Sequence, residues 1–340
     1  MTSKDIITRS KAKRLAIFNH KGGVGKTTLT YNVAVALADL GKKVLLVDSD
    51  PQCNLTSYIV EEDVIDDLLD HSDTDEGQTV WSAVLPVVEG MGNVRKITPI
   101  GASHSNLHLV PGDIRLSEFE SELTESWSQC IQRKVKGFRG TTALSYLVNR
   151  LTSESRTPFD FVFYDSGPNI GPLNRAVLLD CDCFIVPVAY DLFSVRALKT
   201  LGRTLAAWIQ EWTTIADLAP DGTYLLPGRP QFMGYVPQNF RVYGGQPTSQ
   251  HLIYASKIDR RIQSEVIAVL RNVDPHLAPR SASQSKLGEV QDFASLVPAS
   301  QSEGDALWEV ATGSAQLRDA ARAAFDSIAR KIVSLANPGS

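Results

Sequence analysis

A glycine-rich loop between a short apolar run and a helical pattern most constrains the fold of this chain. The run Arg14–Asn19 (RLAIFN) has the composition of a buried strand, and residues 28–40 place apolar side chains at helical spacing. Between them, residues 21–28 read KGGVGKTT. A strand, a glycine-rich loop and a helix start, in this order, bring several backbone amides to one point, and such a point binds phosphate.

Each part of this loop has a chemical task in a phosphate site. Its glycines permit backbone angles that a Cβ would forbid, so the amides can converge on phosphate oxygens. Lys26 is expected to reach the β- and γ-phosphates, and the Thr27 hydroxyl to complete the coordination of Mg²⁺. His20 stands where the usual motif begins with glycine, and we interpret it as a residue that shapes the loop. The predicted nucleotide-binding residues of the loop are Gly22, Gly23, Val24, Gly25, Lys26, Thr27 and Thr28.

The rest of the chain alternates apolar strands with helical stretches. The run Lys43–Asp48 follows Gly41 and is almost continuously apolar, as in a strand buried on both faces of a parallel sheet. Similar runs occupy residues 159–165, 183–188 and 232–236, and helical patterns occupy residues 140–151, 173–179, 193–212 and 315–335. This alternation predicts an α/β fold with a doubly wound, mostly parallel sheet.

The sequence predicts one elaborated domain. We expect a flexible tail at residues 1–13 and a single domain at 14–336, with elaborations at about 56–150 and 274–304. Residues 61–76 contain many acids and no Lys or Arg, which is typical of a solvated surface. Residues 274–304 are rich in Ser, Pro and Gln, and we expect a long connection with one edge strand near Phe293–Val297.

Composition excludes several classes of protein. The 340 residues are 43% hydrophobic and 21% charged, which suits a globular protein with a large core. No run of 18 apolar residues is present, and the first residues lack the apolar segment of a secretory signal, so we expect a cytoplasmic protein. The four cysteines are too few for a disulfide framework, and we interpret Cys181 and Cys183 as packing residues. A net charge of -4 leaves room only for a local basic patch.

The loop resembles the deviant Walker A motif of the ParA/MinD/Soj group of P-loop ATPases. A second lysine, Lys21, precedes the glycines, and the form KGGVGKTT is closest to the ParA/Soj branch. This resemblance implies that two protomers sandwich ATP and that Lys21 reaches the phosphates held by the opposite protomer. It runs from Lys13 to about Arg271 and is weaker in the C-terminal helix.

Two further motifs carry the resemblance. Residues 48–54 (DSDPQCN) match the DxDPQxN switch I segment, which implies that Asp50 positions the attacking water and that Asp48 lies near magnesium. Residues 159–165 (FDFVFYD) have the Walker B form, which implies that Asp165 holds Mg²⁺ through water. Asp50 could also cap the following helix. The predicted catalytic residues are Lys21, Lys26 and Asp50, and the predicted metal site consists of Thr27, Asp48 and Asp165.

Switch II departs from the common family form. The usual continuation is D-C-P-P, whereas residues 165–169 read DSGPN. Similar variants belong to a ParA-like subgroup that also carries P-x-x-x-D-L-F-S, which residues 187–194 match. The departure leaves the partner and the biological role open.

The residues that contact the nucleotide base are the least determined part of the site. The resemblance places Pro237-Gln-Asn239 near the base, where the Gln238 and Asn239 amides suit adenine, although a simple loop role fits equally well. The nearest approach to the guanine-binding N-K-x-D pattern is 256–259 (SKID). It lacks the first Asn and lies in a helical pattern, so we interpret it as helix surface.

A basic helix face is the candidate DNA surface. Lys257, Arg260 and Arg261 share one face and could follow a phosphate backbone, the more so when a dimer doubles the patch. The alternative is a solvated face with ion pairs to Asp259 and Glu265. The C-terminal helix at 315–335 contains acids among its basic residues and makes a weak membrane anchor.

These features predict an ATPase switch that forms a homodimer with Mg-ATP and acts in DNA partition. We expect sequence-nonspecific DNA binding in the ATP state, association with the nucleoid, slow hydrolysis, a ParB-like stimulating partner and no membrane. One alternative is a nucleotide-gated regulator or defence component that binds proteins. Another is a MinD-like positioning ATPase. Ligase chemistry, as in dethiobiotin synthetase, leaves Lys21 unexplained.

Overall fold

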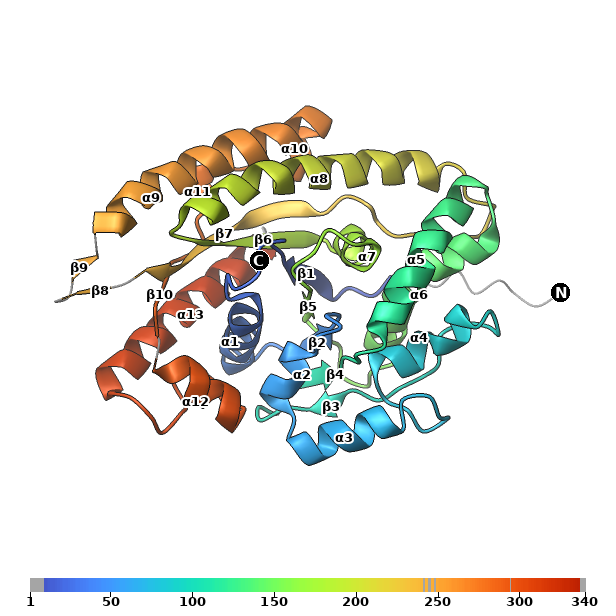
Figure 1. The fold of residues 1–340 in the computed structure, drawn as a ribbon, viewed down its shortest axis with the longest axis horizontal. Coiled ribbons are helices and arrows are strands. Elements are labelled where there is room, and N and C mark those ends of the chain that lie inside the picture. The colour runs from blue at the N-terminus through green and yellow to red at the C-terminus, as the bar shows by residue number, and fades with distance from the viewer. Residues whose placement is uncertain (1–8, 241, 244–245, 248, 294, 337–340) are drawn as a thin grey trace.

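An eight-stranded sheet forms the centre of the molecule in the computed structural model, which describes residues 9–336 except 241, 244–245, 248 and 294 (Figure 1). Seven strands run parallel, in the spatial order β10 (Val290–Gln291), β7 (Gln231–Phe240), β6 (Cys183–Ala189), β1 (Lys13–Ile17), β5 (Phe161–Asp165), β2 (Val44–Asp48) and β4 (Leu107–Val110). Edge strand β3 (Ile100–Gly101) pairs antiparallel with β4. The predicted doubly wound, mostly parallel fold is confirmed.

Helices cover both faces of this sheet because its strands bury side chains on both sides. Leu15 and Ile17 of β1 face one core, and Ala16 and Phe18 face the other. The first core packs against α1 (Lys26–Asp39), α2 (Asn54–Ile59), α12 (Leu296–Glu303) and α13 (Ala315–Ala336). The second packs against α4 (Val80–Val88), α5 (Leu116–Ile131), α6 (Val135–Ser153), α7 (Pro172–Asp180), α8 (Leu192–Ala216), α9 (Ser249–Arg261), the π-helical segment Ile262–Ile267 and α10 (Ala268–Val273).

Smaller elements complete the fold. These are α3 (Glu62–Asp70), the strand pair β8 (Val242–Tyr243) and β9 (Gln246–Pro247), a 3-10 turn at Pro275–Leu277 and α11 (Ala282–Ser285). No residue of the acidic helix α3 is buried, as expected for a solvated segment. Within the described ranges, none of the helices has the length and apolar composition needed to span a membrane.

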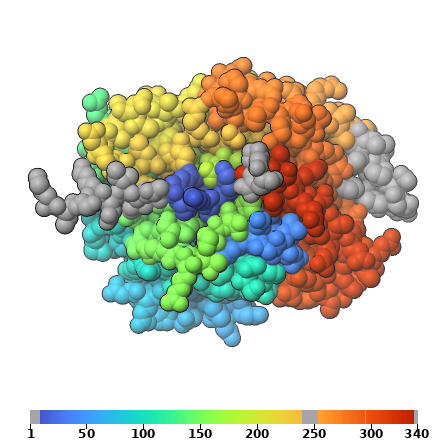
Figure 2. Space-filling model, turned by 180° about the vertical axis from the view of Figure 1, so that it is seen from behind, coloured from blue at the N-terminus to red at the C-terminus, as the bar shows by residue number. Residues whose placement is uncertain are grey.

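The described end of the predicted tail, from Arg9 onward, contacts the rest of the domain. Arg9 donates a hydrogen bond to the Asp180 carbonyl and lies 3.5 Å from the Asp182 carboxylate. The Ser10 amide donates to Asn149 Oδ1 at 2.7 Å, so the chain is docked before β1 begins. Seen from behind, the start of β1 (dark blue) reaches the surface in the middle of the molecule (Figure 2). Residues 1–8 lie outside the described part of the chain.

The predicted edge strand near residues 293–297 is wrong in position. The edge strand is β10 at Val290–Gln291, and the chain then enters helix α12 at Leu296. Phe293 and Leu296 are both buried in the core, and the Leu296 amide donates to the Phe293 carbonyl at 2.7 Å. Pro298 falls in the first helical turn, where an amide has no helical partner to lose.

Candidate functional site

The glycine-rich loop joins β1 to α1 at the carboxyl edge of the sheet. Gly23 and Gly25 have φ angles of 69° and 76°, which other residues rarely adopt. Gly25 is also short of space, since a Cβ there would lie 2.7 Å from Gln238 Oε1. The positive φ favours glycine here, and the first turn of α1 has amides without helical partners and no side-chain cap.

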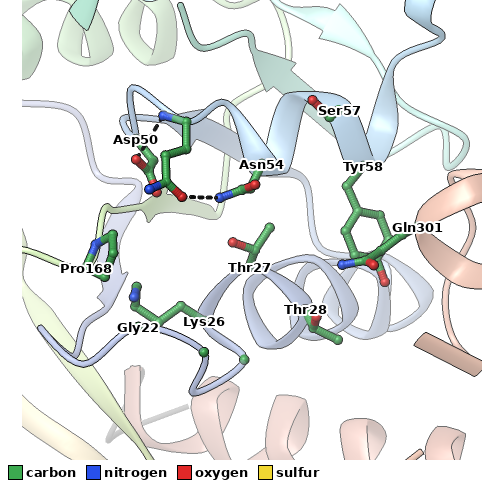
Figure 3. A pocket seen from close by; sticks show the side chains of 13 residues that line it. Gly22, Lys26, Thr27, Thr28, Asp50, Asn54, Ser57, Tyr58, Pro168 and Gln301 are labelled. Atoms are coloured by element: carbon green, nitrogen blue, oxygen red, sulfur yellow. Dashed lines mark hydrogen bonds between the residues drawn. The ribbon is translucent and has the colours of Figure 1, made fainter. Parts of the chain in front are cut away.

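The loop forms one wall of a cavity of about 450 Å³. Figure 3 shows Asp50 and Pro168 at one end of this cavity and Tyr58 and Gln301 at the other. Between the two ends lie the residues at the start of α1, which include Lys26, Thr27 and Thr28. The three segments predicted to form one site therefore meet: the glycine-rich loop, switch I and switch II.

Lys26 places a buried positive charge in this cavity. Only 8% of the residue is exposed. Burial lowers the pKa of Lys26, and the nearby carboxylates of Asp165 and Asp50 act in the opposite direction. A cation that already lies in a poorly solvated site can bind an incoming phosphate without much further loss of hydration.

Asp165 and Thr27 lie together behind the loop. The Thr27 hydroxyl donates to Asp165 Oδ2 at 2.7 Å, and Asp165 is fully buried. Burial and the neighbouring Asp48 raise the pKa of Asp165 to about 7. The carboxylates of Asp50 and Asp165 thus share one buried lysine, with Asp48 close to Asp165, and a cation would offset the repulsion among the three carboxylates. A hydroxyl with carboxylates is a donor set that fits Mg²⁺, which takes its other ligands from phosphate and water.

Asp48 ties switch I to the sheet. Its Oδ2 accepts hydrogen bonds from the Thr56 amide at 2.8 Å and the Thr56 hydroxyl at 2.7 Å, and its Oδ1 accepts one from the Asp50 amide at 3.2 Å. Burial raises the pKa of Asp48 to about 6. Because both oxygens are engaged, this geometry gives Asp48 a positioning task. Its predicted place near magnesium stays a prediction.

Asp50 faces the cavity and forms a turn. Its Oδ1 accepts a hydrogen bond from the Gln52 amide at 3.0 Å. It does not cap the next helix, because the N-cap of α2 is Cys53 with φ 52°. Burial raises the pKa of Asp50, and Lys26 acts to lower it. Within the described part of the chain Asp50 Oδ2 accepts no hydrogen bond, and a carboxylate oxygen of this kind at the cavity wall can orient a water molecule.

Lys21 points away from this cavity. Its Nζ lies 2.6 Å from Asp191 Oδ2 and 2.9 Å from the Ser194 hydroxyl, at the start of α8. Asp191 also caps α8 by accepting the Ser194 amide at 2.8 Å. Burial acts to raise the pKa of Asp191, but hydrogen bonds from Lys21 and Ser194 outweigh burial and hold this pKa below its usual value. Asp191 and Ser194 belong to the D-L-F-S motif. The second lysine of the loop is therefore in contact with this motif.

The two predicted base-contacting residues lie at the end of β7. Gln238 lies inside β7, which continues to Phe240 rather than ending near Val236. Its side chain is 3% exposed and packs on Gly25, and among the described residues its Nε2 has no hydrogen-bond partner. The side chain of Asn239 lies outside the part that is described. Base contact by either residue stays a prediction.

The predicted basic face on α9 is exposed. Lys257, Arg260 and Arg261 are all open to solvent, and Ile258 anchors the helix beneath them. Arg261 pairs with Glu265 at 2.5 Å, as the alternative interpretation expected. Asp259 instead accepts a hydrogen bond from the Tyr235 hydroxyl at 2.6 Å. The SKID segment at 256–259 is helical, as predicted.

A second basic face, on α8, was missed from sequence. Arg196, Lys199 and Arg203 are exposed and recur at the spacing of one helix face, which is the signal that could have found them. Gly202 of α8 meets the backbone of Glu265 so closely that a side chain could not fit between them. The two basic helices therefore belong to one layer (Figure 1).

Two other sequence features have structural explanations. Cys181 is fully buried, and in the described ranges no group of three or more His, Cys, Asp or Glu side chains is arranged to hold a metal ion by itself. Helix α13 buries Phe325, Ile328 and Ile332 in the core, so these side chains are not free to enter a membrane.

Comparisons with known proteins decide the family. Residues 12–216 match a family model described as an AAA domain. The chain is 32% identical to the sporulation initiation inhibitor protein Soj of Bacillus subtilis over 219 residues, which are 63% of this chain and 72% of Soj. The chain belongs to the ParA/Soj family. It is also 30% identical to the chromosome partitioning protein ParA of Caulobacter vibrioides, over 56% of this chain and 61% of that one.

Solved structures of similar fold extend over most of the chain. Protein DIP2308 of Corynebacterium diphtheriae aligns with a TM-score of 0.73 and 25% identity, covering 96% of this chain and all of that one (100%). McdA of Cyanothece, in complex with ATP, aligns with a TM-score of 0.61 and 20% identity over 95% of this chain and 97% of its own. Cobyrinic acid a,c-diamide synthase of Mycobacterium smegmatis, with bound ADP and magnesium, aligns with a TM-score of 0.52 and 22% identity over 77% and 93%.

The ParA/Soj family is a group of P-loop ATPases, and structural neighbours of this chain bind ATP, or ADP with magnesium. The family model ends at residue 216. Gln238, the basic helix α9 and the helix that carries Gln301 all lie beyond it, so their contributions depend on this chain's own geometry.

Proposed function

We propose that this chain is an ATP-driven switch of the ParA type, which forms a homodimer with Mg-ATP, binds DNA in that state and resets by slow hydrolysis. One observation carries the proposal: Lys26, Thr27 and Asp50 line one cavity, with Asp165 bonded to Thr27 behind it, while the second lysine of the loop lies outside the cavity. A switch that acts across a dimer needs a phosphate site in each protomer and a second cation that can leave its own protomer's contacts to reach the partner. Lys21 is that cation in this proposal.

The residues of the cavity divide the work of hydrolysis. Lys26 and the loop amides hold the phosphates and offset the charge that develops on them. Asp50 orients the attacking water with its free oxygen. Thr27 and Asp165 are the residues that would hold Mg²⁺, which supplies Lewis-acid stabilisation of the phosphate charge when bound. Asp48 keeps switch I on the sheet through Thr56, so that Asp50 stays at the cavity wall.

The surroundings of Lys21 support action in the opposite protomer. In this monomer Lys21 is neutralised by Asp191, and the contact is only partly buried, so it can be exchanged for a phosphate. Exposed apolar side chains follow Asp191 directly in the chain: Leu192 and Phe193 are 45% and 71% exposed, and Ile170 of switch II is also 41% exposed. Covering such side chains in a dimer is favourable.

Lys21→Gln is expected to keep ATP affinity close to that of the wild type and to remain monomeric with ATP. The reason is that Lys21 does not line its own cavity. Asp191→Asn serves as the matched variant, since it releases Lys21 from its partner and keeps a side chain that can cap α8. It should still dimerise with ATP. Light scattering with size-exclusion chromatography measures the oligomeric state of both variants. Equal loss of the dimer in both would mean that Lys21 serves only to stabilise the start of α8 through Asp191.

DNA is the proposed target of the ATP-bound dimer. Relatives of this chain are named chromosome partitioning proteins, and the exposed basic faces of α8 and α9 fit a phosphate backbone. A monomer offers few contacts, whereas a dimer joins two patches and gains effective concentration. The proposal therefore includes ATP dependence, indifference to sequence and a steep fall of affinity with salt. A ParB-like protein is the proposed stimulating partner.

Arg260→Glu with Arg261→Glu is expected to abolish ATP-dependent DNA binding and to leave ATP-dependent dimerisation intact. Anisotropy titrations of a labelled duplex at two salt concentrations measure the binding. Arg330→Glu with Lys331→Glu is the matched control, because it makes the same charge change on α13, which covers the opposite face of the sheet. Wild-type protein that dimerises with ATP but binds no DNA at low salt would defeat the partition proposal and favour a regulator that binds proteins.

A further inference from the structure

Helix α12 reaches the cavity from a part of the chain that the family model does not cover. Gln301 of α12 lines the cavity beside Tyr58 of switch I helix α2 (Figure 3). Both lie at the end opposite Asp50 and Pro168. If the γ-phosphate lies at Asp50 and the loop amides cradle the remaining phosphates, the Gln301 end receives the nucleoside.

The position of α12 is held by buried hydrogen bonds. Tyr58 and Ser300 are 2% and 0% exposed, and their hydroxyl oxygens are 2.6 Å apart. Ser300 donates to the Asp305 carbonyl at 2.5 Å, which leaves its oxygen to accept the Tyr58 hydroxyl proton. Buried polar pairs of this kind are costly to break, because a buried hydroxyl that loses a hydrogen bond cannot replace it with water. The position of helix α12 is therefore coupled to that of α2.

Two further bonds fasten the end of α12 to α1. The Tyr31 hydroxyl donates to the Gly304 carbonyl at 2.5 Å, and the Tyr31 and Tyr58 rings lie 4.7 Å apart. Asn32 Oδ1 accepts the Leu307 amide at 2.9 Å, and its Nδ2 donates to the Thr28 carbonyl in the first turn of α1. The segment that presents Gln301 is thus attached to the helix that follows the phosphate loop as well as to switch I.

We propose that Gln301 is a nucleotide-binding residue that contacts the nucleoside part of ATP, and that the Tyr58–Ser300 bond positions it. This inference rests on the proposed ATP binding. The Gln301 amide carries both donors and acceptors and suits the hydroxyls of a ribose. Because α12 is attached to α2, nucleotide binding should tighten the contact between switch I and α12.

Titration calorimetry with Mg-ATP and with inorganic tripolyphosphate tests the assignment. Gln301→Ala should weaken ATP binding about 2- to 10-fold, the effect of one neutral hydrogen bond, and leave tripolyphosphate binding unchanged. Ser302→Ala, the adjacent exposed position on α12, is the control and should bind as wild type does. Equal ATP affinity of the Gln301 and Ser302 variants would overturn the proposal. Equal weakening toward both ligands would overturn the nucleoside assignment.

A second measurement tests the positioning part. Tyr58→Phe removes only the hydroxyl, and it should weaken ATP binding as much as Gln301→Ala does, with no additional loss in the double variant. ATP should also slow backbone hydrogen exchange in residues 296–303 of the wild type and not of Gln301→Ala. Additive losses of ATP affinity in the double variant would contradict the coupling. So would equal protection of residues 296–303 from hydrogen exchange in the wild type and in Gln301→Ala. Wild-type protein that binds no ATP would instead refute the proposed function itself.

Discussion

Replacing Lys26 by alanine is expected to weaken Mg-ATP binding roughly 10- to 100-fold and to abolish measurable turnover. The variant loses a charge-assisted contact to phosphate in a poorly solvated site, and such contacts contribute about 1.5–3 kcal/mol. It also leaves the carboxylates of Asp50 and Asp165 without the lysine that offsets them. Calorimetry for affinity and phosphate release for turnover measure the two effects.

The control for this variant is an exposed lysine on the same chain. Lys11→Ala removes the same group just before β1, at the opposite end of that strand from the loop, and should bind and hydrolyse ATP as wild type does. Circular dichroism of both variants shows that the fold is retained. An ATP affinity of Lys26→Ala equal to that of Lys11→Ala would remove the phosphate-site assignment.

Replacing Asp50 by alanine is expected to lower turnover about 100-fold or more while ATP still binds. Positioning and activation of a nucleophile by a side chain typically contributes two to four powers of ten. The phosphate cradle does not include the Asp50 side chain, and the main structural loss is one hydrogen bond from the Gln52 amide. Single-turnover phosphate release, measured with ATP affinity on the same preparation, separates chemistry from binding.

Asp50→Asn removes the negative charge of residue 50 but can keep the turn that its side chain forms with Gln52. The amide oxygen of asparagine can still accept the Gln52 amide, so this variant keeps the local conformation of switch I. It should nevertheless hydrolyse ATP as slowly as the alanine variant. If the asparagine variant is as fast as wild type and only the alanine variant is slow, Asp50 acts by shaping the turn and another group orients the water.

The fold was largely predictable because its signals are local. Strands buried on both faces produce continuous apolar runs, and the predicted runs at 43–48, 159–165 and 183–188 correspond to β2, β5 and β6. The short strands β3, β4 and β10 carry no such signal. Residues 296–303 form a helix because Phe293 and Leu296 are fixed in the core, a tertiary cause that composition does not reveal.

The phosphate loop and the switches were predictable because each is a contiguous motif with its own chemistry. Their meeting in one cavity follows from the parallel sheet, whose strand ends share an edge. Three features of the site depend on contacts between distant segments and were not predicted. Lys21 rests on Asp191, Gln238 packs on Gly25, and Gln301 enters the cavity from a segment that reads as a loop.

The central claim is that ATP, and not ADP, drives two copies of this chain together. Sedimentation velocity of the wild type and of Asp50→Ala, each with Mg-ATP, with Mg-ADP and without nucleotide, tests it most directly. If the chain is a ParA-type switch, Asp50→Ala should form a stable dimer with ATP, and the wild type a weaker or transient one. Both proteins should be monomers with ADP and without nucleotide. A protein that binds ATP and sediments as a monomer throughout, or as a dimer regardless of nucleotide, would contradict it.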